Sequence, residues 1–181
     1  MLKKWSATLV LGTALLVASG PSSVAAQEMA PPFGDPENLA YAAQVWEQMA
    51  GYEQWKVTTP VYAGASPHGK FLRMFSSYIT VDGIARPIIV KQNFGGPEVT
   101  AQAATKNPEE WLKAVTIMLQ REPGYDDDND NWFWVKFASD GSVMKNPKGV
   151  QLAGRVAKDM PAGCIACHLS AEGGDYLYFN D

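Results

Sequence analysis

Five consecutive residues near the C-terminus carry the most informative chemistry of the chain. Cys164, Cys167 and His168 form the pattern C-x-x-C-H, and the 181 residues contain no other cysteine. Two thiols at this spacing can both form thioether bonds to the vinyl groups on one edge of a porphyrin. The adjacent imidazole can then bind the iron. The motif therefore predicts one covalently bound haem c, attached through Cys164 and Cys167, with His168 as an iron ligand.

Three other uses of these residues stay open on sequence alone. A redox-active C-x-x-C pair is typical of a strand-to-helix junction, and no such strand precedes Cys164. A structural zinc site needs four Cys or His ligands, and only His68 could supply the fourth. A disulfide that closes so small a loop would constrain the unfolded chain little. Haem attachment is the favoured interpretation.

The first 26 residues have the pattern of a bacterial secretory signal peptide. Lys3 and Lys4 precede an uncharged apolar stretch from residue 7 to residue 18, and small residues at 24 to 26 fit cleavage after position 26. The apolar stretch is short for a membrane span, although an uncleaved N-terminal anchor is an alternative. Because c-type haem is attached outside the cytoplasm, the signal and the haem motif agree, and we predict a periplasmic location.

Length and charge indicate one acidic domain after this signal. Cleavage leaves 155 of the 181 residues, which we divide into a leader at 27–34 and a single haem-binding domain at 35–181. Two of the 15 basic residues lie in the signal, so 13 basic and 19 acidic residues remain. No basic patch indicates a nucleic-acid partner, and we predict none.

The patterning of the mature chain predicts an α+β fold: an antiparallel β-sheet with an N-terminal amphipathic helix and a short C-terminal helix for haem attachment. Asp35 and Pro36 form a typical helix start, and apolar residues recur at helical spacing to about Trp55. Asp82-Gly83 is a hairpin-type turn. Four strands are expected, at residues 70–81, 87–94, 115–121 and 132–137.

The acidic loop at 126–131 only superficially suggests calcium binding. It lacks the glycine at the sixth position of an EF-hand loop, and Phe137 stands where the closing Glu is needed. We expect a solvated hairpin loop.

Several blocks together resemble the cytochrome P460 family and its relatives, the cytochromes c′-β. They are Pro67-His68-Gly69, residues 88–94, residues 132–136, the C-x-x-C-H motif, and Asp175-Tyr176 beyond it. The resemblance covers roughly residues 55 to 179. It implies a small, sheet-rich and often dimeric protein with one haem, whose iron is bound by His168 on one side and open on the other.

The resemblance also implies candidate site residues. Lys91 matches a lysine that is cross-linked to the haem in the hydroxylamine-oxidising branch, and Arg73 matches an arginine on the open side of the haem. In the c′-β branch an apolar cap takes that place, for which Phe71, Phe75 and Phe94 are candidates.

Independent reasoning from the residues favours a special role for Lys91. Strand alternation puts it on the same face as Ile89, and a lysine on an apolar face is costly unless it is paired, covalently neutralised or able to reach water. His68 is a further candidate, as a sixth iron ligand or proton donor. Met74 and Met118 are weaker axial candidates, because methionine in strands commonly packs in the core.

One departure from the family pattern bears on catalysis. The oxidising enzymes place a carboxylate two residues beyond the haem-binding histidine, where it can accept a proton from the substrate. Here that residue is Ser170, and Glu172 is the candidate substitute, with Asp175 as an alternative.

Two functions follow as hypotheses. The first is a haem oxidoreductase that oxidises hydroxylamine or a related small nitrogen compound and passes electrons to a small periplasmic acceptor. The second is a non-catalytic protein that binds nitric oxide or a similar gas. Electron transfer alone ranks third, because it usually involves six-coordinate iron. A homodimer is expected from the resemblance.

Overall fold

The computed structural model describes residues 32–178, which form an antiparallel seven-stranded sheet and a few helices. The predicted signal peptide at 1–26 and most of the leader at 27–34 lie outside this range. In chain order the elements are α1 (Pro36–Gln48), η1 (Tyr52–Gln54), β1 (Val57–Thr58), β2 (Tyr62–Ala63), β3 (Phe71–Val81), β4 (Ile84–Phe94), α2 (Ala101–Lys106), α3 (Pro108–Trp111), β5 (Leu112–Gln120), η2 (Asp127–Asn129), β6 (Trp132–Phe137), β7 (Ala153–Gly154) and α4 (Cys164–His168).

The sheet confirms the predicted α+β class and the four predicted strands. Its order is β1-β3-β4-β5-β6-β7, with β2 also paired to β3. The two longest strands, β3 and β4, form a hairpin across Asp82 and Gly83, whose φ angles are 51° and 76°. Two successive residues with positive φ match the right-handed twist of a hairpin, which explains the Asp-Gly pair.

Helix α1 is shorter than the sequence predicted. It begins as expected, because the Asp35 side chain accepts a hydrogen bond from the Asn38 N–H at 3.0 Å. It ends at Gln48, and Gly51 then adopts a left-handed conformation with φ 75°. The predicted end near Trp55 is wrong, because the chain turns at Gly51 and only a short 3-10 turn follows.

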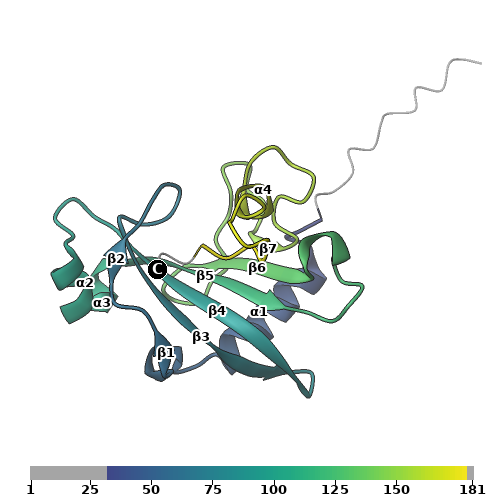
Figure 1. Ribbon diagram of the computed structural model, residues 1–181, viewed down its shortest axis with the longest axis horizontal. Helices are drawn as coiled ribbons and strands as arrows, with labels where there is room; N and C mark the ends of the chain where they lie inside the picture. Colours follow the sequence, from purple (N-terminus) through teal and green to yellow (C-terminus); the bar gives the residue numbers. More distant parts are fainter. Residues whose placement is uncertain (1–31, 179–181) are drawn as a thin grey trace, which may run out of the picture.

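The two faces of the sheet carry different helices, α1 on one side and α4 on the other (Figure 1). Directly paired residues of neighbouring antiparallel strands point to the same face, so the strand register shows on which face of the sheet each side chain lies. The face toward α1 holds the larger apolar cluster, to which α1 contributes Tyr41, Ala42 and Val45 and the sheet contributes Phe75, Val90, Val115, Ile117 and Phe133.

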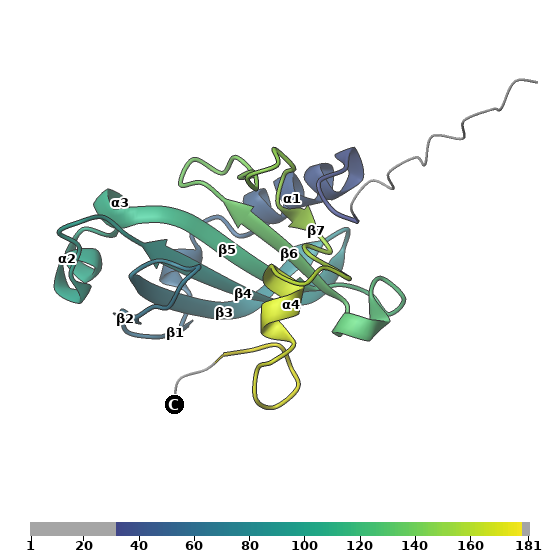
Figure 2. The same ribbon diagram turned by 90° about the horizontal axis from the view of Figure 1, so that it is seen from above.

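The opposite face packs beneath α4 (Figure 2). Ile165 of α4 is buried there against a second apolar cluster of the sheet, formed by Met74, Ile89, Met118, Trp132 and Trp134. This face therefore positions the C-x-x-C-H motif. Within residues 32–178, no helix has the length and apolar character needed to cross a membrane.

Candidate functional site

Helix α4 presents the two thiols together. Cys164 and Cys167 are three residues apart in a helix and so share one side of it, and neither is bonded to another cysteine. Cys164 is half-buried against the apolar cluster of the sheet, whereas Cys167 is exposed. Burial raises the pKa of the Cys164 thiol, although the positive charges of Lys91 and Lys136 oppose this effect. The predicted short helix for the motif is confirmed.

Gly163 allows the chain to enter this helix. Its φ is 133°, in a region that side chains rarely adopt, and a Cβ atom at this position would lie 2.3 Å from the Cβ of Ala157. The segment around Ala157 also holds α4 in place, since the Ile165 N–H donates to the carbonyl of Val156 at 3.2 Å.

Replacing Gly163 with Ala is expected to lower the free energy of unfolding by about 2–4 kcal/mol, because backbone strain and a steric clash add. The matched control is Gly124→Ala, where φ is 90° and no atom lies within 4 Å of the new Cβ. That variant should lose about 1 kcal/mol. Denaturant unfolding of both holoproteins measures the difference, and equal losses would contradict the assigned role of Gly163.

The ring of His168 is fixed in an orientation suited to metal binding. Its Nδ1 lies 2.6 Å from the backbone carbonyl of Tyr176 and can donate a hydrogen bond to it. That tautomer leaves the lone pair of Nε2 free for a metal. The ring packs against Trp134 and Tyr178, with centroid distances of 4.8 and 5.3 Å. Burial lowers the pKa of His168 more than the hydrogen bond to Tyr176 raises it. This net lowering favours the neutral imidazole, which is the form that binds a metal.

The acidic loop supports the partner of His168. The Tyr176 hydroxyl lies 3.1 Å from the carbonyl of Asp128 and 3.3 Å from the side-chain oxygen of Asn129, both of which accept hydrogen bonds. Asp126 is buried and forms an ion pair with Lys158. The expectation of a solvated hairpin loop is therefore wrong in part, because Asp126 and Asn129 are buried, the first paired with Lys158 and the second in contact with Tyr176.

Lys91 lies on the same face of the sheet as α4. It belongs to a row of directly paired residues across four strands, Met74, Lys91, Thr116 and Lys136. Its Nζ is 3.1 Å from Nε2 of His68. Burial lowers the pKa of Lys91 to about 8, Cys164 opposes this effect, and Lys136 adds to it. The structure therefore places a poorly solvated amine on the face of the sheet that also carries the C-x-x-C-H motif.

His68 joins the same group of residues. Its ring centroid is 6.2 Å from that of His168, with the two rings nearly perpendicular. Burial and the charge of Lys91 lower the pKa of His68 to about 4, so its imidazole is neutral near pH 7. Met74 and Met118, the weaker axial candidates, lie in the apolar cluster on this face.

Arg73 lies on the opposite face. Its partner on β4 is Gln92, the residue after Lys91, and neighbouring residues of a strand point to opposite faces. The Cζ atom of Arg73 is 5.0 Å from the ring centroid of Phe75, and its Nε donates a hydrogen bond to Thr58 Oγ1 at 3.3 Å. The structure therefore does not bring Arg73 near His168. The same alternation applies to the three predicted cap residues: Phe75 belongs to the cluster under α1, and Phe71 and Phe94 to a third apolar cluster.

The segment after α4 carries hydroxyl groups near the position where the oxidising enzymes have a carboxylate. Ser170 Oγ donates to the carbonyl of Cys167 at 2.7 Å and lies 2.7 Å from the hydroxyl of Tyr178. Glu172 is exposed. Asp175 accepts a hydrogen bond from the Leu177 N–H at 3.0 Å, which is a turn-stabilising role. Tyr178 was not among the predicted site residues, although it lies beside His168.

The chemistry of this face fits a haem. His168 offers a neutral nitrogen, the thiols are unbonded, and the surrounding side chains are mainly apolar. Among the described residues, the buried indole N–H groups of Trp132 and Trp134 have no hydrogen-bond partner. Buried donors normally have acceptors, and the propionates of a haem are acceptors. A haem would therefore be held by Cys164, Cys167 and His168.

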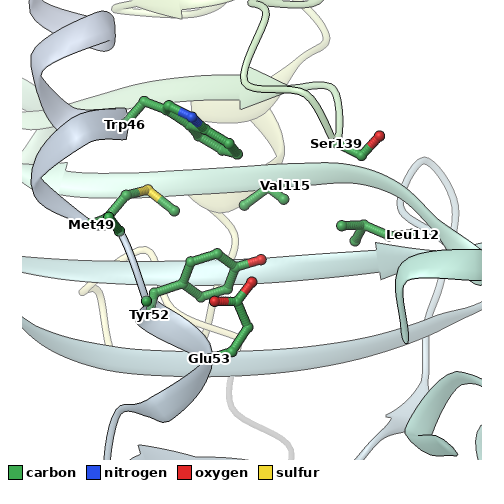
Figure 3. A pocket seen from close by; sticks show the side chains of 9 residues that line it. Trp46, Met49, Tyr52, Glu53, Leu112, Val115 and Ser139 are labelled. Atoms are coloured by element: carbon green, nitrogen blue, oxygen red, sulfur yellow. The ribbon is translucent and has the colours of Figure 1, made fainter. Parts of the chain in front are cut away.

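A cleft of about 280 Å³ lies elsewhere, on the α1 side of the sheet (Figure 3). Trp46, Met49 and Tyr52 line it together with Val115, whose side chain faces α1. Its position on the face opposite to α4 separates it from the haem motif.

Comparisons with known proteins agree with this site. The family model described as cytochrome P460 matches residues 49–179, which include every element from η1 to α4. No match was found among the curated proteins or among the solved structures.

Proposed function

Because the chain belongs to the cytochrome P460 family, we propose that this haem cytochrome is a periplasmic enzyme with its haem cross-linked to Lys91, and that it oxidises hydroxylamine or a related small nitrogen compound. The haem is a single haem c. Cys164 and Cys167 form its thioether bonds, and His168 binds the iron through Nε2. Electrons leave to a small periplasmic acceptor.

The observation that supports this proposal most strongly is the position of Lys91. A lysine amine attacks carbon only in its neutral form, and burial lowers the pKa of Lys91 to about 8. About one tenth of the amine is therefore neutral at pH 7, far more than for a lysine in water. Lys91 pairs with Met74, which belongs to the apolar cluster under Ile165, so Lys91 lies on the side of the sheet that carries the haem-attachment motif.

A haem held by these residues would supply the redox chemistry of its iron. The protein provides the surroundings. Trp134 and Tyr178 pack on the ring of His168, and the carbonyl of Tyr176 keeps its Nδ1 protonated, which directs Nε2 to the metal. The apolar cluster beneath α4 limits access of water to this side of the sheet.

One observation favours the gas-binding alternative. The sequence places Ser170 where the oxidising enzymes carry a carboxylate, its hydroxyl is engaged by Cys167 and Tyr178, and Glu172 is exposed. Hydroxylamine oxidation would then lack general-base assistance, whereas binding of nitric oxide requires no proton transfer.

A homodimer is also proposed. Val57 and Tyr78 are exposed to 64% and 71%, and both line a cleft at the edge of the sheet together with Gln54, Trp55, Lys56, Ser76 and Ser77. An exposed apolar patch at a short edge strand is a common site of association. A second copy of the chain is the proposed occupant.

Steady-state assays of the purified holoprotein separate the two functions. The enzyme should reduce a soluble redox dye at a rate that depends on both protein and hydroxylamine. Tight binding of nitric oxide with no dye reduction would support the gas-binding function and contradict the enzymatic one.

A further inference from the structure

The loop that carries His68 is fixed against strand β4. The Gly64 N–H donates to the carbonyl of Lys70 at 2.9 Å, and the His68 N–H donates to the carbonyl of Ala65 at 2.9 Å. A Cβ on Gly69 would lie 2.4 Å from the carbonyl oxygen of Phe94. Glycine at position 69 therefore permits close contact with the end of β4, which places the neighbouring His68 over that strand.

This placement gives Lys91 a defined partner. A lysine side chain has several rotatable bonds, and holding it in one conformation costs side-chain entropy. Nζ of Lys91 lies 3.1 Å from Nε2 of His68, a distance at which the amine can donate a hydrogen bond. An imidazole with its proton on Nδ1 has a free lone pair on Nε2, so His68 can accept this bond.

We propose that His68 is a positioning residue for the bond between Lys91 and the haem: its Nε2 accepts a hydrogen bond from Lys91 Nζ and holds the amine on the side of the sheet that carries α4. This inference rests on the proposed function, since it requires the cross-link. It assigns His68 to the lysine and not to the iron.

The cross-linking step has a simple balance. A C–N bond forms between Lys91 Nζ and a carbon of the porphyrin edge, while one N–H and one C–H bond break. Two electrons and two protons leave. Hydrogen peroxide can take up the two electrons and the two protons, and it is thereby reduced to two molecules of water. His68 is not consumed, because it only orients the amine.

The test compares His68→Ala and His68→Gln in the complete holoprotein treated with hydrogen peroxide. After proteolysis, mass spectrometry gives the fraction of haem peptide that also carries the Lys91 peptide. His68→Ala should lower this fraction at least fivefold, and His68→Gln, whose amide oxygen also accepts a hydrogen bond, should restore most of it. Thioether attachment at Cys164 and Cys167 should be unchanged in both variants, and an unchanged circular dichroism spectrum verifies that they fold.

The outcomes are distinguishable. An unchanged cross-link in His68→Ala overturns this inference alone, as does a His68→Gln variant as defective as His68→Ala. A wild-type holoprotein with no Lys91–haem bond overturns the proposed cross-linked enzyme as well. Conversion of a low-spin ferric spectrum to a high-spin one in His68→Ala would instead identify His68 as an iron ligand, and this would also overturn the inference. Should His68→Ala not accumulate, His68→Leu is compared with His68→Gln by the same criteria.

Discussion

A variant with both Cys164→Ala and Cys167→Ala is expected to lose all thioether-bound haem. These are the only cysteines of the chain, so no other thiol can form a thioether. Both lie on α4, which is held by the Ile165–Val156 hydrogen bond and by burial of Ile165. The measurement is the haem that stays with the protein after extraction with acidified acetone. A matched control is Ser170→Ala on the following turn, which should retain its haem.

Haem that resists extraction in the double cysteine variant would contradict the thioether assignment, unless it is retained by Lys91 alone. Mass spectrometry of the haem peptide decides between these two origins. The single variants should each keep one thioether bond, because each leaves one thiol on the same side of α4.

Replacing Lys91 with Ala is expected to have the second large effect. A covalent bond from the amine to the porphyrin changes its electronic structure, so the wild-type ferrous protein should absorb well to the red of an unmodified five-coordinate c-type haem. Lys91→Ala should remove this band completely. Hydroxylamine oxidation should fall by at least tenfold, which corresponds to about 1.4 kcal/mol of transition-state stabilisation.

Lys136→Ala is the matched control for that variant. Lys136 lies in the same row across the sheet as Lys91, with Thr116 between them, and both charges act on Cys164. A red-shifted band that persists in Lys91→Ala and disappears in Lys136→Ala would transfer the cross-link to Lys136. A band that survives in both variants would exclude a cross-link to either lysine.

The sequence predicted the elements well where local patterns decide the structure. The C-x-x-C-H motif and the β-branched and aromatic runs need only neighbouring residues, and α4 and the strands β3 to β6 were predicted from them. The end of α1 was not, because the apolar spacing continues past Gln48, while the left-handed conformation of Gly51 ends the helix.

The faces of the strands decide which candidate site residues lie on the side of the sheet that carries α4. Alternation from Ile89 put Lys91 on an apolar face, and the structure shows that this face carries α4. Arg73 was selected from the resemblance without its register. Its pairing with Gln92 puts it on the α1 side.

Other contacts join segments far apart in the chain, so no local pattern could reveal them. The carbonyl of Tyr176 accepts a hydrogen bond from His168. The Tyr176 hydroxyl donates to the carbonyl of Asp128, which lies 48 residues earlier in the chain. The side-chain contact between His68 and Lys91 spans 23 residues. A backbone carbonyl also has no residue-type signal, so the partner of His168 needed the three-dimensional structure.

The most direct test of this account is the mass of the haem-bearing fragment from a proteolytic digest of the native holoprotein. The account predicts one haem joined both to the peptide containing Cys164 and Cys167 and to the peptide containing Lys91, with two hydrogen atoms fewer than the sum of the haem-bearing motif peptide and the free Lys91 peptide. A fragment in which the haem is attached to the cysteine peptide alone would contradict the role assigned to Lys91. A haem attached to neither peptide would contradict the site as a whole.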